Sequence, residues 1–322
     1  MDFNSKNARM CSRIGARATY GQAINSIASK NKNVIALSAD LGRSSGLDRF
    51  SKEYPNQYIN TGIAEQNLVG CASGIARTGF NVFASTFAPF ASLRASEQVR
   101  MNMGYMQEPV NLVALGSGLA LAYLGNSHFG LEDISVMRGI PDINIVCPAD
   151  CFEIYKVLNA AIKFKKPLYI RLTGAINCPI VYMDDYKFEI GKSVEVIKSK
   201  KINVLSHGTT VGHAKKAINE LADVGIEVGL FNFHTINPLD KKSLDEIYHS
   251  SKQILVFEEH VKSGGLGSAV LEYFNDIDKD TTKIKRFGIN GWIKKTGTYN
   301  FMLQETKLDS EGIRNTILEA IE

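Results

Sequence analysis

The stretch Tyr58-Ile-Asn-Thr-Gly-Ile-Ala-Glu-Gln-Asn67 decides how the rest of the chain is interpreted. An extended run ends at Gly62, and helical spacing of apolar residues predicts a helix after it, at Leu68, Val69, Ala72, Ile75 and Ala76. Glu65 then lies in the first turn, where an acid complements the helix dipole and Thr61 is a possible cap. A capping box, however, would place the acid at Ala64. Glu65 therefore calls for a functional interpretation as well.

A second informative stretch is Asn81-Val-Phe-Ala-Ser-Thr-Phe-Ala-Pro-Phe90, an apolar run that ends in two aromatic residues three positions apart. Together the two stretches resemble thiamine diphosphate enzymes of the transketolase type. In that family a Glu in a Gly-Ile-Ala-Glu-Gln pattern hydrogen-bonds N1′ of the cofactor's aminopyrimidine, and an aromatic residue after Ser-Thr-Phe packs against the pyrimidine ring. The resemblance implies that Glu65 is a catalytic and cofactor-binding acid and that Phe87 and Phe90 contact the cofactor.

Composition places the chain among ordinary globular proteins. Its 322 residues, 44% of them hydrophobic, are enough for two domains. The net charge of +4 is small and scattered, which argues against nucleic acid as a ligand. The apolar runs are too short for a membrane span and the N-terminus lacks a signal peptide's apolar core, so we expect a cytoplasmic protein. Five cysteines without a C-x-x-C pair indicate neither a disulfide framework nor a zinc site.

The first part of the chain supplies candidate substrate residues. A helix is predicted from Ser12 to Asn31, followed by a buried strand, Val34 to Ser38, and a polar loop. Ligands of open parallel sheets bind beyond the carboxyl ends of the strands. The resemblance implies that Arg17 and Ser44 contact the substrate phosphate and that Asp40 lies near the cofactor. Arg17 could equally belong to a solvated basic face, and small polar loop residues often satisfy only their own backbone.

The glycine-rich loop from Gly116 to Gly130 contains His128. A lone His in such a loop is usually structural, but Gly-Asn-Ser-His-Phe-Gly is similar to the family's Gly-Pro-Thr-His run, in which the His faces the reacting carbons. Transketolases also place an Asp four residues before this His, where it binds a sugar hydroxyl, and a second His twelve residues before it, near the substrate. This chain has Leu124 and Gly116 at those positions. The resemblance thus implies an intact cofactor half and an altered substrate half of the site.

The fold expected from these signals is α/β: a parallel-sheet pyrimidine-binding domain over 1–175, a linker over 176–188, and a smaller α/β C-terminal domain over 189–322. Strand and helix signals alternate in both parts. Lys166 to Arg171 is predicted to close the first sheet as an edge or final strand. The resemblance assigns Arg171 to the substrate phosphate, although a strand-end Arg facing solvent is an equal alternative.

The sequence lacks the Gly-Asp-Gly motif with which full transketolases hold the diphosphate and Mg²⁺. No metal-ligating cluster is apparent either. The resemblance implies one subunit of a split enzyme, with Mg²⁺ ligands from a partner that carries the N-terminal domain, in a two-plus-two heterotetramer.

The implied reaction is transfer of a two-carbon ketol unit from a ketose, a phosphorylated or modified sugar, to an aldehyde. Glu65 would share a proton with N1′, kept protonated by burial, and His128 would move protons at substrate oxygens. Alternatives are a 1-deoxyxylulose-5-phosphate synthase-like or 2-oxo acid decarboxylase beta-type subunit, or a non-catalytic structural partner. A nicotinamide dehydrogenase is disfavoured, because no strand is followed by the required glycine fingerprint.

Overall fold

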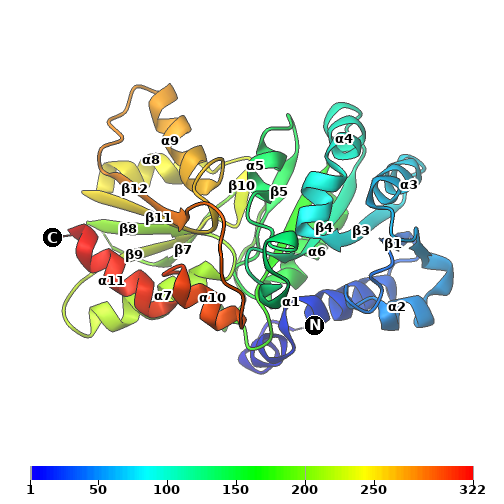
Figure 1. Ribbon diagram of the computed structural model, residues 1–322, viewed down its shortest axis with the longest axis horizontal. Helices are drawn as coiled ribbons and strands as arrows, with labels where there is room; N and C mark the ends of the chain where they lie inside the picture. The colour runs from blue at the N-terminus through cyan, green and yellow to red at the C-terminus, as the bar shows by residue number, and fades with distance from the viewer. Residues whose placement is uncertain (1, 200, 322) are drawn as a thin grey trace.

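The computed structural model describes residues 2–199 and 201–321 and confirms the α/β fold class. Two sheets lie side by side, each covered by helices on both faces (Figure 1). In the described parts of the chain, no helix is both long and apolar enough to cross a membrane.

The first sheet has seven strands in the order β10-β5-β6-β4-β3-β1-β2. Its strands are parallel except for β10, which pairs antiparallel with β5. The bounds are β1 Val34–Ser38, β2 Tyr58–Asn60, β3 Asn81–Phe87, β4 Val110–Ser117, β5 Asn144–Val146, β6 Leu168–Thr173 and β10 Thr235–Asn237. Of the two alternatives predicted for Lys166 to Arg171, the edge strand was wrong, since β6 lies between β4 and β5. It is the final strand of the first half in chain order. The actual edge strand beyond β5 comes from the second half of the chain.

The helical segments around this sheet are α1 Ser5–Ala28, α2 Asp48–Glu53, η1 Pro55–Gln57, α3 Glu65–Arg77, η2 Phe90–Arg94, α4 Ser96–Gln98, η3 Val99–Tyr105, η4 Ala122–Ser127, α5 Asp133–Arg138 and α6 Glu153–Phe164. Helix α1 begins earlier than predicted and is kinked at Gly15, whose φ is +79°. A side chain there would place its Cβ 2.7 Å from the carbonyl oxygen of Ala175, so the close approach requires glycine. The segment from Phe90 to Tyr105 is mostly π-helical, with only Ser96–Gln98 as a short α-helical piece.

The second sheet has five strands in the order β12-β11-β8-β9-β7, with only β7 antiparallel to its neighbour. The strands are β7 Val194–Ile197, β8 Ile202–Ser206, β9 Gly229–Asn232, β11 Gln253–Val261 and β12 Ile284–Ile289. The helices are α7 Thr210–Ala222, α8 Lys241–Ser250, α9 Leu266–Asp276, α10 Tyr299–Glu305 and α11 Ser310–Ile321. The predicted alternation of strands and helices in this half is confirmed.

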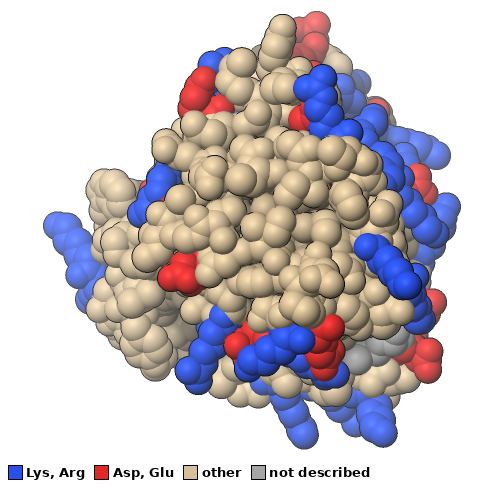
Figure 2. All heavy atoms as spheres, turned by 90° about the vertical axis from the view of Figure 1, so that its right-hand side faces the viewer, with Lys and Arg blue, Asp and Glu red and all other residues tan. Residues whose placement is uncertain are grey.

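One face of the molecule, on the side of α3 and α4, carries few charged side chains at its centre. Figure 2 shows mainly uncharged residues there, with Lys and Arg gathered along the border. Exposed large apolar side chains occur in β2, just before α3, in η2 and at the end of η3, namely Ile59, Ile63, Leu93, Tyr105 and Met106. A face with few central charges and neighbouring exposed apolar side chains are features typical of a protein interface.

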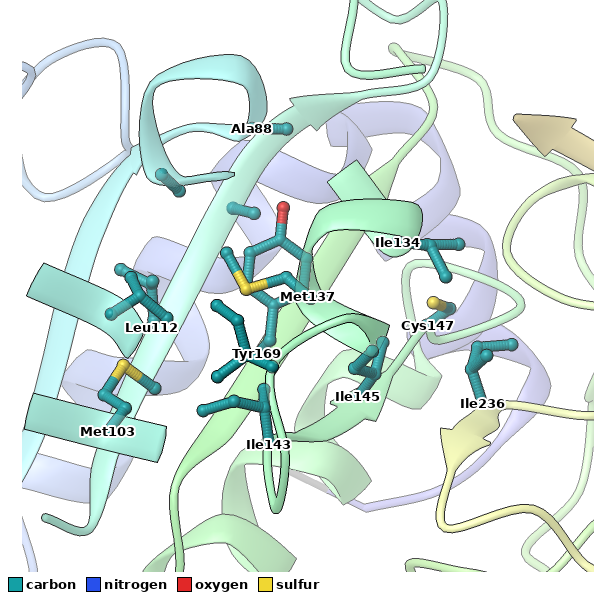
Figure 3. Close-up of a cluster of buried hydrophobic side chains, with 14 of the residues drawn as sticks. Ala88, Met103, Leu112, Ile134, Met137, Ile143, Ile145, Cys147, Tyr169 and Ile236 are labelled. Carbon is teal, nitrogen blue, oxygen red and sulfur yellow. The ribbon is translucent and has the colours of Figure 1, made fainter. Parts of the chain in front are cut away.

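The hydrophobic core is continuous between the two halves of the chain. Ile145 of β5 and Ile236 of β10 lie in the same buried cluster as Tyr169 of β6 and Met137 of α5 (Figure 3). The cluster extends to Phe233 and further buried side chains of the second half. The two sheets therefore hold each other in a defined orientation, which matters for residues at their boundary.

Candidate active site

Glu65 is the first residue of α3, and the preceding loop delivers it there. Gly62 has a φ of +72°, and its amide donates to the side chain of Asn60 at 3.0 Å. The amide of Thr61 donates to the carbonyl of Ser38 at 3.0 Å, which ties the loop to the end of β1. Thr61 makes no cap, and Ala64 occupies the N-cap position. The predicted place of Glu65 in the first turn is confirmed.

The carboxylate of Glu65 is 3% exposed and bonds to Arg94, with 2.9 Å between Oε1 and Nη1. The guanidinium of Arg94 lies 3.9 Å from the centroid of the Phe90 ring. The π-helical turn that begins at Phe90 brings these two residues together. Oε2 of Glu65 accepts no hydrogen bond from the described residues, so it remains available to a ligand.

His128 completes an aromatic group with the two phenylalanines. Its ring centroid lies 5.4 Å from that of Phe90 and 6.0 Å from that of Phe87, edge-on in both cases. The hydroxyl of Ser127 lies 2.9 Å from Nδ1 of His128. Residues from α3, the end of β3, η2 and the glycine-rich loop thus form one cluster, in which Arg94 and Phe90 link Glu65 to His128.

Three of the predicted substrate residues line a common cavity next to this cluster. Arg17, Ser44 and Gly116 border a cavity of about 190 Å³, together with Phe87 and the side chain of Leu121. Arg17 makes no hydrogen bond or ion pair with the described residues, so its charge is free for a ligand. The structure therefore brings Arg17 and Ser44 together, as expected for groups that bind one anion.

Asp40 is placed differently. It is exposed, has a φ of +55°, and accepts a hydrogen bond from Asn60 at 3.0 Å. Asn60 also accepts from the backbone amide of Asp40. Asp40 thus ties the loop after β1 to the end of β2, and it does not line the cavity.

The expectation that Arg171 reads a substrate phosphate was wrong. Its side chain is fully buried and pairs with Asp133 at 2.9 Å. It also donates to the backbone carbonyls of Gly130 and Glu259. A guanidinium already committed to a buried carboxylate cannot reach a ligand without breaking that pair.

Leu124 also differs from expectation, because its side chain is 52% exposed and does not line the cavity. At Gly116, with φ +62°, a Cβ would lie 2.6 Å from the side chain of Leu121. Leu121 therefore occupies the space beside Gly116 and makes this wall apolar. Sequence reasoning missed both Leu121 and Arg94. The spacing of Arg94 four residues after Phe90 was a visible signal, whereas nothing local pointed to Leu121.

These groups fit the pyrimidine end of thiamine diphosphate: a buried carboxylate with one free oxygen, next to aromatic rings, at the carboxyl ends of parallel strands. A diphosphate and a divalent cation would need further ligands. The described residues contain no group of three or more His, Cys, Asp or Glu placed to hold a metal ion.

Comparison with known proteins agrees with this fit. Residues 12–175 match the transketolase pyrimidine binding domain, and residues 191–313 match the transketolase C-terminal domain. The chain is 35% identical to the putative transketolase C-terminal section of Methanocaldococcus jannaschii, over 95% of this chain and 96% of that protein. It is 31% identical to one subunit of the apulose-4-phosphate transketolase of Phocaeicola vulgatus, over 96% and 98%.

A solved structure described as a split gene transketolase, an inactive beta4 tetramer, superimposes with a TM-score of 0.84. It is 30% identical, and the match covers 95% of this chain and 98% of that one. The chain belongs to the transketolase family of thiamine diphosphate-dependent transferases.

Proposed function

We propose that this chain is the C-terminal subunit of a split transketolase and works with a separate subunit that carries the diphosphate-binding domain. The observation that carries the proposal is the half-complete site: Glu65, Phe90 and His128 form a cluster suited to the pyrimidine, while the described residues supply no metal cluster. Two relatives that match over nearly their whole length are themselves named as a C-terminal section and as a single subunit of a transketolase.

The assembly we propose is two of these chains with two partners, in which the partner supplies the ligands of Mg²⁺. Two observations support an interface on the side of α3: the face in Figure 2 has few central charges, and large apolar side chains are exposed in β2 and just before α3. Within the chain we propose a pyrimidine-binding domain over 1–175, a linker over 176–188 and a C-terminal domain over 189–322. Strand β10 crosses this division, since it pairs with β5.

Bound thiamine diphosphate supplies the carbanion chemistry that breaks and forms the carbon–carbon bond. This chain would hold and activate it. Glu65 would share a proton at N1′ of the pyrimidine through Oε2, while Arg94 would orient the carboxylate through Oε1. Phe87 and Phe90 would pack against the ring, and the half-buried His128 would hold or move a proton at the substrate oxygens.

The substrates we propose are sugars with an anionic end, held by Arg17 and Ser44, and with an apolar or unsubstituted group facing Gly116 and Leu121. A hydroxyl placed against Leu121 would lose its hydrogen bonds to water without gaining another, at a cost of about 1–3 kcal/mol. Ordinary ketose phosphates should therefore be poorer donors than a sugar that lacks or inverts that hydroxyl.

The test is calorimetry of the chain with thiamine diphosphate and Mg²⁺, first alone and then with the partner subunit, identified as a product carrying Gly-Asp-Gly. We expect no tight binding by the chain alone, and binding and turnover by the complex. Micromolar binding and turnover by the purified chain alone would overturn the split-subunit proposal.

The same complex, assayed with a panel of donors, separates the alternatives. Ketol transfer between sugars supports a transketolase. Consumption of pyruvate or another 2-oxo acid would instead support a 1-deoxyxylulose-5-phosphate synthase-like or a decarboxylase beta-type subunit. The proposed specificity would be contradicted if xylulose 5-phosphate and ribose 5-phosphate turn over as well as any other donor and acceptor pair tested.

A further inference from the structure

The loop that carries His128 is closed at its base by a pair of backbone hydrogen bonds. The amide of Gly118 donates to the carbonyl of Gly130 at 2.8 Å, and the amide of Gly130 donates back at 3.0 Å. Residues 119–129 therefore form one closed loop at the end of β4. The position of His128 relative to Phe87 and Phe90 depends on how the base of this loop is held.

Glu259, on β11 of the second sheet, holds one side of the base. Its side chain is 1% exposed, and Oε1 accepts from the amide of Leu119 at 2.6 Å. Its other oxygen accepts from Tyr299 at 2.7 Å and from Thr209 at 3.2 Å. Glu259 is thus anchored within the second half of the chain and reaches across to the loop.

Arg171 holds the other side of the base. A single nitrogen, Nη2, donates to the carbonyl of Gly130 at 2.9 Å and to that of Glu259 at 3.0 Å. The ion pair with Asp133 fixes the guanidinium in place. One fully buried cation therefore connects β6, the base of the loop and β11.

The fit at the base leaves no spare room. Gly118 has a φ of +66°, and a Cβ there would lie 2.3 Å from Oε1 of Glu259. Further along, the side chain of Asn126 donates to the carbonyl of Ile293 at 2.6 Å, and the amide of Val261 donates to the carbonyl of Leu131 at 3.0 Å. The second half of the chain thus contacts the loop at its base, its tip and its exit.

We propose that the C-terminal domain positions the catalytic loop through Glu259, which together with Arg171 of β6 clamps the base of the loop and thereby sets the location of His128. Both are positioning residues. The inference rests on the proposed role of His128 in proton transfer. It gives the second domain a task in catalysis although none of its residues lines the cavity between Arg17 and Phe87.

The first test compares Glu259→Ala with Glu258→Ala. Glu258 is the preceding residue of β11 and is equally buried, but its carboxylate accepts from the amides of Leu266 and Gly267 at the start of α9. Hydrogen exchange read by mass spectrometry should show faster exchange in peptides covering 119–130 for Glu259→Ala. For Glu258→Ala, the faster exchange should appear near the start of α9 instead.

In the assembled enzyme, Glu259→Ala should lower kcat by about 10- to 100-fold with a smaller change in KM, because misplaced catalytic groups cost about that much. Glu259→Gln should recover most of this activity, since its amide oxygen still accepts from Leu119. Glu258→Ala should keep kcat close to wild type per folded molecule. Equal losses in both alanine variants, or unchanged exchange in 119–130, would overturn the proposal.

A double variant tests whether Glu259 acts through His128. In a His128→Ala background, Glu259→Ala should have little further effect on kcat, because residues acting as a unit are not additive. Fully additive losses would contradict the mechanism. Full activity of His128→Ala alone would refute the proposed role of His128 and the catalytic consequence of the clamp, while the exchange data would still decide the clamp itself.

Gly118→Ala attacks the same contact from the loop side and serves if Glu259→Ala fails to fold. The added Cβ is forced against Oε1 of Glu259 and requires an unfavourable positive φ. The same loop-specific gain in exchange and the same loss in kcat are expected. A Gly118→Ala enzyme with wild-type exchange and kcat would overturn the proposal.

Discussion

At the scale of single residues, burial and pairing separate groups that the sequence presents as equals. Arg17 and Arg171 were both candidates for binding phosphate, yet Arg17 is exposed and has no ion pair among the described residues, whereas Arg171 is buried against Asp133. Arg171 instead pairs with Asp133 and donates hydrogen bonds to backbone carbonyls in the interior of the protein. Removing one partner of such a pair leaves the other charge buried and uncompensated, which typically costs about 3–5 kcal/mol.

Glu65→Gln is the direct test of the proposed acid. The amide keeps the size of the side chain and an oxygen for Arg94, but it cannot exchange a proton with N1′. We expect turnover of the assembled enzyme to fall on the order of 10²-fold or more. The measurement is kcat at saturating cofactor, with thermal unfolding as a check that the fold persists. Activity within tenfold of wild type would refute the assignment.

At the scale of elements, the π-helical segments η2 and η3 depart from regular α-helical geometry. In η2, the guanidinium of Arg94 lies over the ring of Phe90 and also bonds to the carboxylate of Glu65. π-Helical segments are frequent at functional sites, and this one carries two members of the cluster, Phe90 and Arg94.

Phe90→Ala should weaken thiamine diphosphate binding in the assembled enzyme more than Tyr105→Ala does. An aromatic contact contributes about 0.5–1.5 kcal/mol beyond its buried area, equivalent to roughly a 2- to 10-fold change in Kd. Tyr105 lies at the end of η3 and is 79% exposed, so it provides an aromatic control within the same region. Cofactor titration at constant enzyme assembly measures the effect, and equal shifts in Kd would mean that Phe90 only packs in the core.

At the scale of the whole molecule, the boundary between the two sheets contains buried groups that link folding to pH. Burial lowers the pKa of His207 to about 3, and neither of its ring nitrogens has a hydrogen-bond partner among the described residues. Burial likewise raises the pKa of Glu153 to about 7, with nearby Asp150 adding to the effect. Both groups are therefore neutral in the folded protein under conditions where the unfolded chain would charge them.

The two shifts have opposite consequences for stability. For His207, the unfolded chain binds a proton below about pH 6.5 and the folded protein does not, so stability is lost as pH falls from 6.5 towards 3. The His207→Leu variant has no group that titrates there and should not lose this stability. The difference in free energy of unfolding, variant minus wild type, should therefore rise by about 2 kcal/mol when the pH falls from 7 to 5, since one pKa unit corresponds to about 1.4 kcal/mol.

Glu153→Gln is the matched control with the opposite sign. The folded protein keeps the proton on Glu153 up to about pH 7, so wild type loses stability as pH rises from 4.5 to 7 and the glutamine variant does not. Urea unfolding of wild type and both variants at pH 5, 6, 7 and 8 measures the two slopes. Parallel pH profiles for all three proteins would contradict the burial of these groups as neutral species.

Local patterns in the sequence were sufficient for the class of fold, the alternation of strands and helices, and the place of Glu65 in the first turn of its helix. They were sufficient because hydrophobic periodicity and short motifs are properties of neighbouring residues. The same motifs also indicated the protein family and pointed to the aromatic pair Phe87 and Phe90.

Only the tertiary structure decided which side chains meet across the chain. The pairing of β10 with β5, the burial of Arg171, the exposure of Leu124 and the contact between Glu259 and Leu119 depend on residues that lie tens of positions or more apart. No local pattern encodes such pairs, because strand order and side-chain burial follow from how the two sheets pack together. The acid at the centre of the site could thus be found from the sequence, whereas the residues that hold the site in place could not.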